Sequence, residues 1–162
     1  MLTKTTISAV RTLIYLGRQA SAAPAPPRVI AEQLGESPTY LAKVTQMLAR
    51  AGILRTQRGV AGGVILNRRP DEITLLAIVE ACQGAILGGF CDASDPADLP
   101  HACAFHQAGL ELHGAIVGVL SRWTLARLLE KPYPTAKHLH ERCLVRAGLF
   151  SVARNTIKDD VG

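Results

Sequence analysis

The sequence predicts a mainly α-helical fold with one small β-hairpin, and three observations lead to this prediction. Apolar residues recur at helical spacing in several segments of the 162-residue chain. Residues 53–67 instead contain two β-rich runs, which a glycine-rich connection joins. The hydrophobic fraction of 48% is sufficient for a core, and the aromatic fraction of 4% indicates that this core is aliphatic.

The first helices of the chain are separated by segments that break helices. Residues 3–19 predict a first helix, and the proline-rich segment 20–27 predicts the loop after it. A short second helix is expected over 28–34, followed by a turn at 35–36. Three residues of this second helix are expected to face the core: Val29, Ile30 and Leu34.

Residues 37–51 predict the helix around which the rest of the chain is organised. Ser37 can cap the free amides of its first turn, and Pro38 suits the first helical position because its missing N–H is not needed there. Gly52 follows, where a helix end favours a residue free to take a positive φ. Four apolar residues share one face of this helix: Leu41, Val44, Leu48 and Ala51.

The hairpin that follows carries arginines and glycines. Its β-rich runs, Ile53–Gln57 and Val64–Asn67, flank the connection 58–63. Two helices joined by a short glycine-containing turn form a helix-turn-helix, in which the second helix is the recognition helix. A plain helical hairpin in a bundle is the alternative, but a basic hairpin directly afterwards favours a winged helix-turn-helix. The glycine-rich connection opens a β run and lacks the Gly-Lys-Ser/Thr ending of a nucleotide-binding loop, so nucleotide binding is rejected.

The charge distribution supports the same function. Residues 1–70 hold ten Lys or Arg and two Asp or Glu, a net charge of +8, whereas residues 71–162 hold eight and eleven, a net charge of −3. A basic half is typical of proteins that bind polyanions. A merely solubilising role is the alternative, and the position of the arginines in the hairpin argues against it.

The second half predicts three further helices. Residues 71–84 predict a helix capped by Asp71 or Thr74, with Cys82 on its apolar face as a core residue. After the loop 85–102, residues 103–121 predict the longest helix. Its apolar seam is Leu110, His113, Ile116, Val117 and Leu120. Thr124 is expected to cap a short last helix.

The chain shows no sign of a membrane or secretory protein. It contains no uninterrupted run of about 18 apolar residues and no signal-peptide pattern, so we expect a cytoplasmic protein without membrane partners. Thiols stay reduced in that compartment. The four cysteines are therefore expected to be buried, metal-binding or redox-sensing rather than paired in structural disulfides: Cys82, Cys91, Cys103 and Cys143. None lies in a recognisable catalytic signature, so we expect no enzyme.

In this order and spacing, the motifs resemble the Rrf-two-type bacterial winged-helix regulators over nearly residues 1–130. This family includes the iron–sulfur cluster assembly regulator, the nitric-oxide-sensitive repressor and the cysteine-metabolism repressor. The matching residues are Ile30-Ala31, Tyr40-Leu41, Ala51-Gly52-Ile53-Leu54, Arg58-Gly59 with Gly62-Gly63 and Leu66, Ile73-Thr74-Leu75 and Thr124-Leu125. The wing motif from Arg58 to Leu66 is the most specific of them.

The resemblance implies a homodimer that is paired through the long C-terminal helix and binds a partly palindromic DNA operator. It implies a DNA-binding domain over 1–70, a sensor loop with dimerisation helices over 71–130, and a peripheral tail over 131–162. We expect a repressor rather than an activator. A winged-helix module that has lost DNA binding and binds a partner protein is the alternative.

The resemblance also implies which residues contact DNA. Ser37, Thr39, Tyr40 and Lys43 should face the groove, and Arg58 should enter the adjacent minor groove. Hydroxyl groups and lysine suit phosphates, whereas arginine suits guanine edges or a narrow minor groove. Four further residues complete the expected interface: Arg28, Gln46, Arg55 and Gly59. Some family members read a base with a glutamate where this chain has Ala42, so its sequence preference is expected to differ.

A sensor function depends on the loop before the long helix. Many members carry three cysteines there, separated by five residues each, and a histidine three positions after the last. Cys91, Cys103 and His106 match this pattern, but Ala97 occupies the middle cysteine position. A [2Fe–2S] cluster needs four ligands, so one is missing, and His101, an aspartate or a partner-subunit residue could supply it.

Three interpretations of this loop remain open. The first is a cluster bound by Cys91, Cys103 and His106, whose loss changes DNA affinity. The second is a reversible thiol–disulfide switch between Cys91 and Cys103. The third is a regulator without a cluster that responds to a partner protein or a small molecule.

Overall fold

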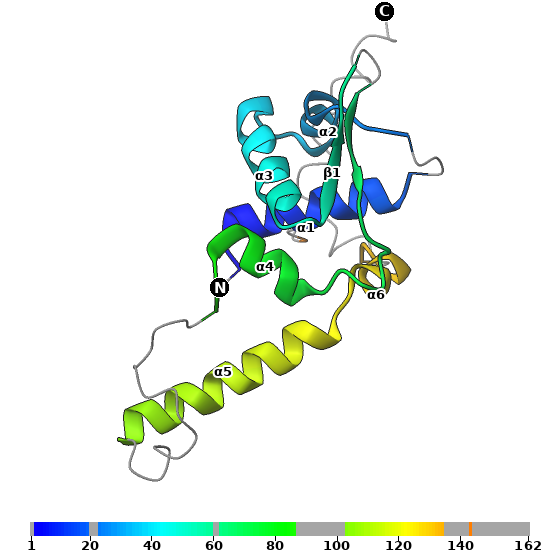
Figure 1. The fold of residues 1–162 in the computed structure, drawn as a ribbon. Helices are drawn as coiled ribbons and strands as arrows, with labels where there is room; N and C mark the ends of the chain where they lie inside the picture. Colours follow the sequence, from blue (N-terminus) through cyan, green and yellow to red (C-terminus); the bar gives the residue numbers. More distant parts are fainter. Residues whose placement is uncertain (1, 20–22, 60–61, 87–102, 135–142, 144–162) are drawn as a thin grey trace, which may run out of the picture.

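The computed structural model describes residues 2–19, 23–59, 62–86, 103–134 and 143 (Figure 1). The elements in this part of the chain are α1 (Lys4–Gly17), α2 (Pro27–Leu34), α3 (Pro38–Arg50), β1 (Leu54–Gln57), β2 (Gly63–Leu66), α4 (Leu75–Gln83), α5 (Ala104–Arg122) and α6 (Leu125–Glu130). The prediction of a mainly helical fold with one hairpin is therefore confirmed.

Four helices begin at the hydroxyl caps that the local sequence provides. The side chains of Thr3, Ser37, Thr74 and Thr124 each accept a hydrogen bond from the backbone N–H three residues further on. Of the two caps expected for α4, Thr74 is therefore the one used. Asp71 instead pairs with Arg69, at 2.8 Å between its Oδ2 and the Nη2 of the arginine.

One aliphatic core joins the first four helices to the wing and α6. Its fully buried members include Leu13, Leu41, Ile78 and Leu125, so it extends across residue 70 without a break. Burial of Ile30 and Leu34 was predicted correctly, but Val29 is 39% exposed. The reason is geometric: Ile30 and Leu34 are four residues apart on one helical face, whereas Val29 is rotated about 100° from Ile30.

The wing is an antiparallel pair in which Leu54 lies opposite Leu66 and Gln57 opposite Gly63. Ala25, from the proline-rich segment, adds a third strand position. Its N–H donates to the carbonyl of Val64 at 3.0 Å and its carbonyl accepts from the N–H of Val64 at 2.9 Å. The wing is thus tied to the loop between α1 and α2, and it extends beyond α3 (Figure 1).

Helix α5 is the longest of the described elements and projects away from the body of the molecule (Figure 1). The predicted seam is divided: Leu120 is buried, whereas Leu110 is 42% exposed. Further large apolar residues of this helix are exposed: Phe105, Leu112 and Val119. Within the described residues, no helix combines the length and the hydropathy that a membrane span requires.

Candidate nucleic-acid interface

Helix α3 exposes a polar stripe opposite its buried face. Thr39, Lys43 and Gln46 are exposed at positions i, i+4 and i+7, and Ser37 is exposed at the cap. Leu41, Val44 and Leu48 are completely buried on the other side. The helix therefore presents hydroxyl, ammonium and amide groups along one line, the combination that contacts phosphates and base edges.

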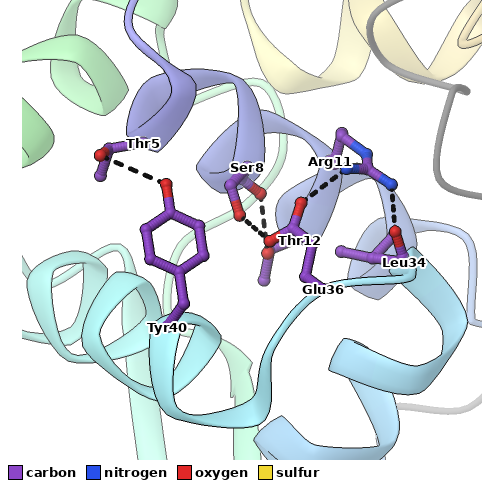
Figure 2. Close-up of polar contacts among 7 residues, drawn as sticks. All are labelled: Thr5, Ser8, Arg11, Thr12, Leu34, Glu36 and Tyr40. Carbon is purple, nitrogen blue, oxygen red and sulfur yellow. Dashed lines mark hydrogen bonds and ion pairs between the residues drawn. The ribbon is translucent and has the colours of Figure 1, made fainter.

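Tyr40 lies beside this stripe rather than on it. Its side chain is partly buried against the core, and its hydroxyl donates to Oγ1 of Thr5 on α1 at 3.3 Å (Figure 2). One helical position separates Tyr40 from Thr39, which corresponds to a rotation of about 100°. Tyr40 therefore links the first turn of α3 to α1.

A polar clamp, formed by Ser8, Arg11, Glu36 and the carbonyl of Leu34, joins α1 to the turn before α3 (Figure 2). Arg11 Nη1 donates to Oε1 of Glu36 at 2.6 Å, and Arg11 Nη2 donates to the Leu34 carbonyl at 2.5 Å. Ser8 Oγ donates to the other carboxylate oxygen. The Arg11 and Glu36 side chains are only 10% and 13% exposed, so the ion pair is shielded from solvent.

The far end of α3 is held from the base of the wing. Arg68 donates from Nη2 to the carbonyl of Ala51 at 3.0 Å and from Nε to that of Gly52 at 3.1 Å. Asn67 Nδ2 also donates to the Gly52 carbonyl at 3.0 Å. A cation at a helix C-terminus also interacts favourably with the helix dipole. Sequence reasoning missed these contacts, because only the register of the hairpin returns residues 67 and 68 to the end of α3.

The wing supplies exposed cations next to the recognition helix. Arg55 and Arg58 are exposed, and Gly59 follows at φ 111°, which glycine tolerates best. Arg28 is exposed in the first turn of α2. In the described ranges no ion pair involves these arginines or Lys43. Their charges are therefore available for a polyanion.

Only two of the expected sensor residues, Cys103 and His106, belong to the described part of the chain. Cys91 and Ala97 lie outside the described residues. Cys103 is exposed immediately before α5, and His106 is 5% exposed, with no hydrogen-bond partner for its Nε2 in the described part of the chain. No group of three potential metal ligands occurs among the residues that the structure describes.

Cys82 differs from Cys103 in its surroundings. It is half-buried at the end of α4 and packs against the core, as its position on the apolar face predicted. Burial raises the pKa of its thiol, and a hydrogen bond with Thr6 partly opposes this effect. Cys82 is thus a packing residue with a protonated thiol at neutral pH.

Comparison with known proteins identifies relatives over most of the chain. The family model described as "Rrf2: Iron-dependent Transcriptional regulator" matches residues 2–131. Protein aau3 of Rhizobium meliloti (strain 1021) is 34% identical over 131 residues, which cover 80% of this chain and 84% of the relative. The HTH-type transcriptional regulator NsrR of Geobacillus kaustophilus (strain HTA426) is 31% identical over 143 residues, or 87% and 97% of the two chains.

The fold also has a close counterpart among solved structures. The structure of CymR (YrzC), the global cysteine regulator of B. subtilis, superposes with a TM-score of 0.64 at 24% identity. The match covers 80% of this chain and 96% of that one. At this level of identity, the similarity confirms the winged-helix fold.

Proposed function

The chain belongs to the Rrf2 family of transcriptional regulators, and from this premise we propose that it is a homodimeric, cytoplasmic repressor of a partly palindromic operator. The family consists of DNA-binding regulators and not of enzymes. The observation that carries the proposal is the polar stripe of α3 beside a wing whose arginines have no ion-pair partners among the described residues.

The interface assigns different tasks to its residues. Thr39 and Gln46, on the exposed stripe of α3, are suited to the major groove, and Lys43 and Ser37 to the adjacent phosphates. Arg58, which directly follows β1, is suited to the neighbouring minor groove. The remaining proposed contacts lie around this centre: Arg28, Tyr40, Arg55 and Gly59.

Dimerisation through α5 is supported by its exposed apolar residues. Phe105, Leu112 and Val119 are 72%, 52% and 46% exposed and follow one another at intervals of seven residues. Trp123, the residue directly after the helix, is 44% exposed and follows Val119 by four residues. Such a stripe is typical of a helix that packs against a second helix. A two-fold dimer would place the two recognition helices on successive half-sites of the operator.

Two of the expected cluster ligands, Cys103 and His106, lie in the described part of the chain and support a cluster-based sensor. Nε2 of the buried His106 has no hydrogen-bond partner among the described residues, and coordination by a metal would satisfy it. Cys103 is exposed one helical turn away and can supply a thiolate, with Cys91 as the third ligand. When bound, a [2Fe–2S] cluster would supply a redox-active centre that joins Cys91 to Cys103 and His106. The fourth ligand would come from His101, an aspartate or the partner subunit.

DNA binding is tested by selecting genomic fragments with the purified protein and measuring affinity against salt. Phosphate contacts release counterions, so the observed binding constant should fall steeply as salt rises. Absence of binding even at low salt would favour the module that binds a partner protein.

The cluster is tested on protein purified without oxygen, by measuring iron, acid-labile sulfide and the visible spectrum. Near-stoichiometric iron and sulfide, lost in Cys91→Ala or Cys103→Ala, would support the cluster. Protein that stays iron-free after reconstitution would favour the two alternatives, a thiol switch or a response to a partner protein or small molecule.

A further inference from the structure

We propose that Glu36 is a positioning residue that sets the orientation of the recognition helix, so that the polar clamp determines operator specificity without touching DNA. This inference rests on the proposed function. It concerns a residue for which the sequence motifs indicated only a turn.

The position of Glu36 in the chain lets it fix where α3 begins relative to α1. It directly precedes the cap residue Ser37, and both of its carboxylate oxygens accept hydrogen bonds from α1. Arg11 contacts Glu36 and also the carbonyl of Leu34 at the end of α2, so a single guanidinium holds both sides of the turn. Gly35 between them has φ 65°, a conformation that lets the two helices meet at a tight angle.

Packing and the clamp act together at this end of α3, where Leu41 in the first turn is completely buried. An open surface groove of about 310 Å³ lies beside the clamp between α1 and the start of α3, lined by Lys4, Ile7, Ser8, Arg11, Glu36 and Tyr40. This groove leaves room beside the first turn of α3, so we expect that turn to shift toward the groove when the clamp is released. Among the described residues, a further hydrogen bond from Tyr40 to Thr5, of 3.3 Å, also links the first turn of α3 to α1; it joins a neutral pair and is therefore a weaker restraint than the clamp.

The other end of α3 is held independently by Arg68 and Asn67. Loss of the clamp would therefore pivot α3 about its C-terminal end instead of releasing it altogether. The residues displaced most would be those of the first turn, including Thr39 and Lys43. Displacement of about 1 Å is enough to lose the geometry of paired contacts to base edges.

If Glu36 acted only through its charge, removing that charge would strengthen DNA binding, whereas loss of the clamp should weaken operator binding. Glu36 is one of only two acidic residues among residues 1–70, and it lies next to a surface proposed to bind a polyanion. Its negative charge should weaken DNA binding. Neutralising Glu36 should therefore strengthen binding to DNA for which the exact orientation of α3 is unimportant. A weaker complex on neutralisation would reveal the positioning role.

The experiment compares Glu36→Gln with Glu32→Gln, an exposed glutamate on α2 that removes the same charge outside the clamp. Affinity is measured for a selected operator and for unrelated DNA, together with the melting temperature. For Glu36→Gln we expect the operator Kd to rise roughly tenfold, which corresponds to the loss of one hydrogen bond to a charged group. The Kd for unrelated DNA should be unchanged or lower. For Glu32→Gln we expect both values to be unchanged or lower.

A second variant covers the case in which Glu36→Gln does not fold. Ser8→Ala removes one hydrogen bond of the clamp without changing charge, and it should lower the ratio of specific to non-specific affinity in the same direction by a smaller factor. The proposal is overturned if the clamp variants bind the operator as tightly as Glu32→Gln does. It is also overturned if both affinities fall in proportion to a lower melting temperature. Failure of the wild-type protein to bind any DNA would instead refute the proposed function, and the clamp's role with it.

Discussion

Replacing Gly63 with alanine should detach the wing from the loop between α1 and α2. A Cβ at this position would lie 2.5 Å from the carbonyl oxygen of Ala25 and 2.7 Å from the nitrogen of Pro26. Both are backbone atoms, so no side-chain rotation can relieve the overlap. The bridge between Ala25 and Val64 must therefore open.

The expected loss follows from the contacts of that bridge. It contains two backbone hydrogen bonds, of 3.0 and 2.9 Å between Ala25 and Val64. Each contributes about 0.5–1.5 kcal/mol, so Gly63→Ala should lower the free energy of unfolding by about 1–3 kcal/mol. The β1–β2 pairing and the buried side chain of Leu54 remain, so the protein should still fold.

Urea denaturation measures this loss, and hydrogen exchange locates it at the amides of Ala25 and Val64. Gly114→Ala is the matched control, because a Cβ there meets nothing within 4 Å and alanine is favoured in a helix interior by roughly 0.5–1 kcal/mol. The control should be neutral or stabilising. Wild-type stability in Gly63→Ala, with both amides still protected, would refute the reasoning.

Three further predictions concern DNA binding, assembly and pH. Arg58→Ala should weaken operator binding by about 1–3 kcal/mol in a mobility-shift titration, and an unchanged affinity would contradict the wing assignment. Leu112→Asp should convert the proposed dimer to a monomer in sedimentation equilibrium, since it places an unpaired charge in the apolar stripe of α5; a persistent dimer would exclude this face. Because burial raises the pKa of Cys82, the protonated thiol contributes to the stability of the folded state. This contribution is fully present below the pKa of an unfolded thiol, about 8.5, and is lost as pH rises through the folded pKa. Denaturation at several pH values should therefore show a smaller alkaline loss for Cys82→Ala than for the wild-type protein.

Features that depend on a few consecutive residues were predictable. The hydroxyl caps at Ser37 and Thr124 form their hydrogen bonds three residues away, so local sequence is sufficient to indicate them. Helical periodicity also separated the buried face of α3 from its polar stripe. By contrast, Val29 was misplaced because a helix of eight residues offers too little pattern to distinguish its core face from its edge.

The sequence by itself determined the fold class, the order of the elements, the basic half and the family resemblance, because these follow from composition, spacing and short motifs. Only the tertiary structure decided how the recognition helix is held. Glu36 and Arg11 are 25 residues apart, and Arg68 and Ala51 are 17 apart. Pairing at such separations depends on how helices and strands pack in three dimensions, and no local pattern of polar residues specifies which distant partner each will meet.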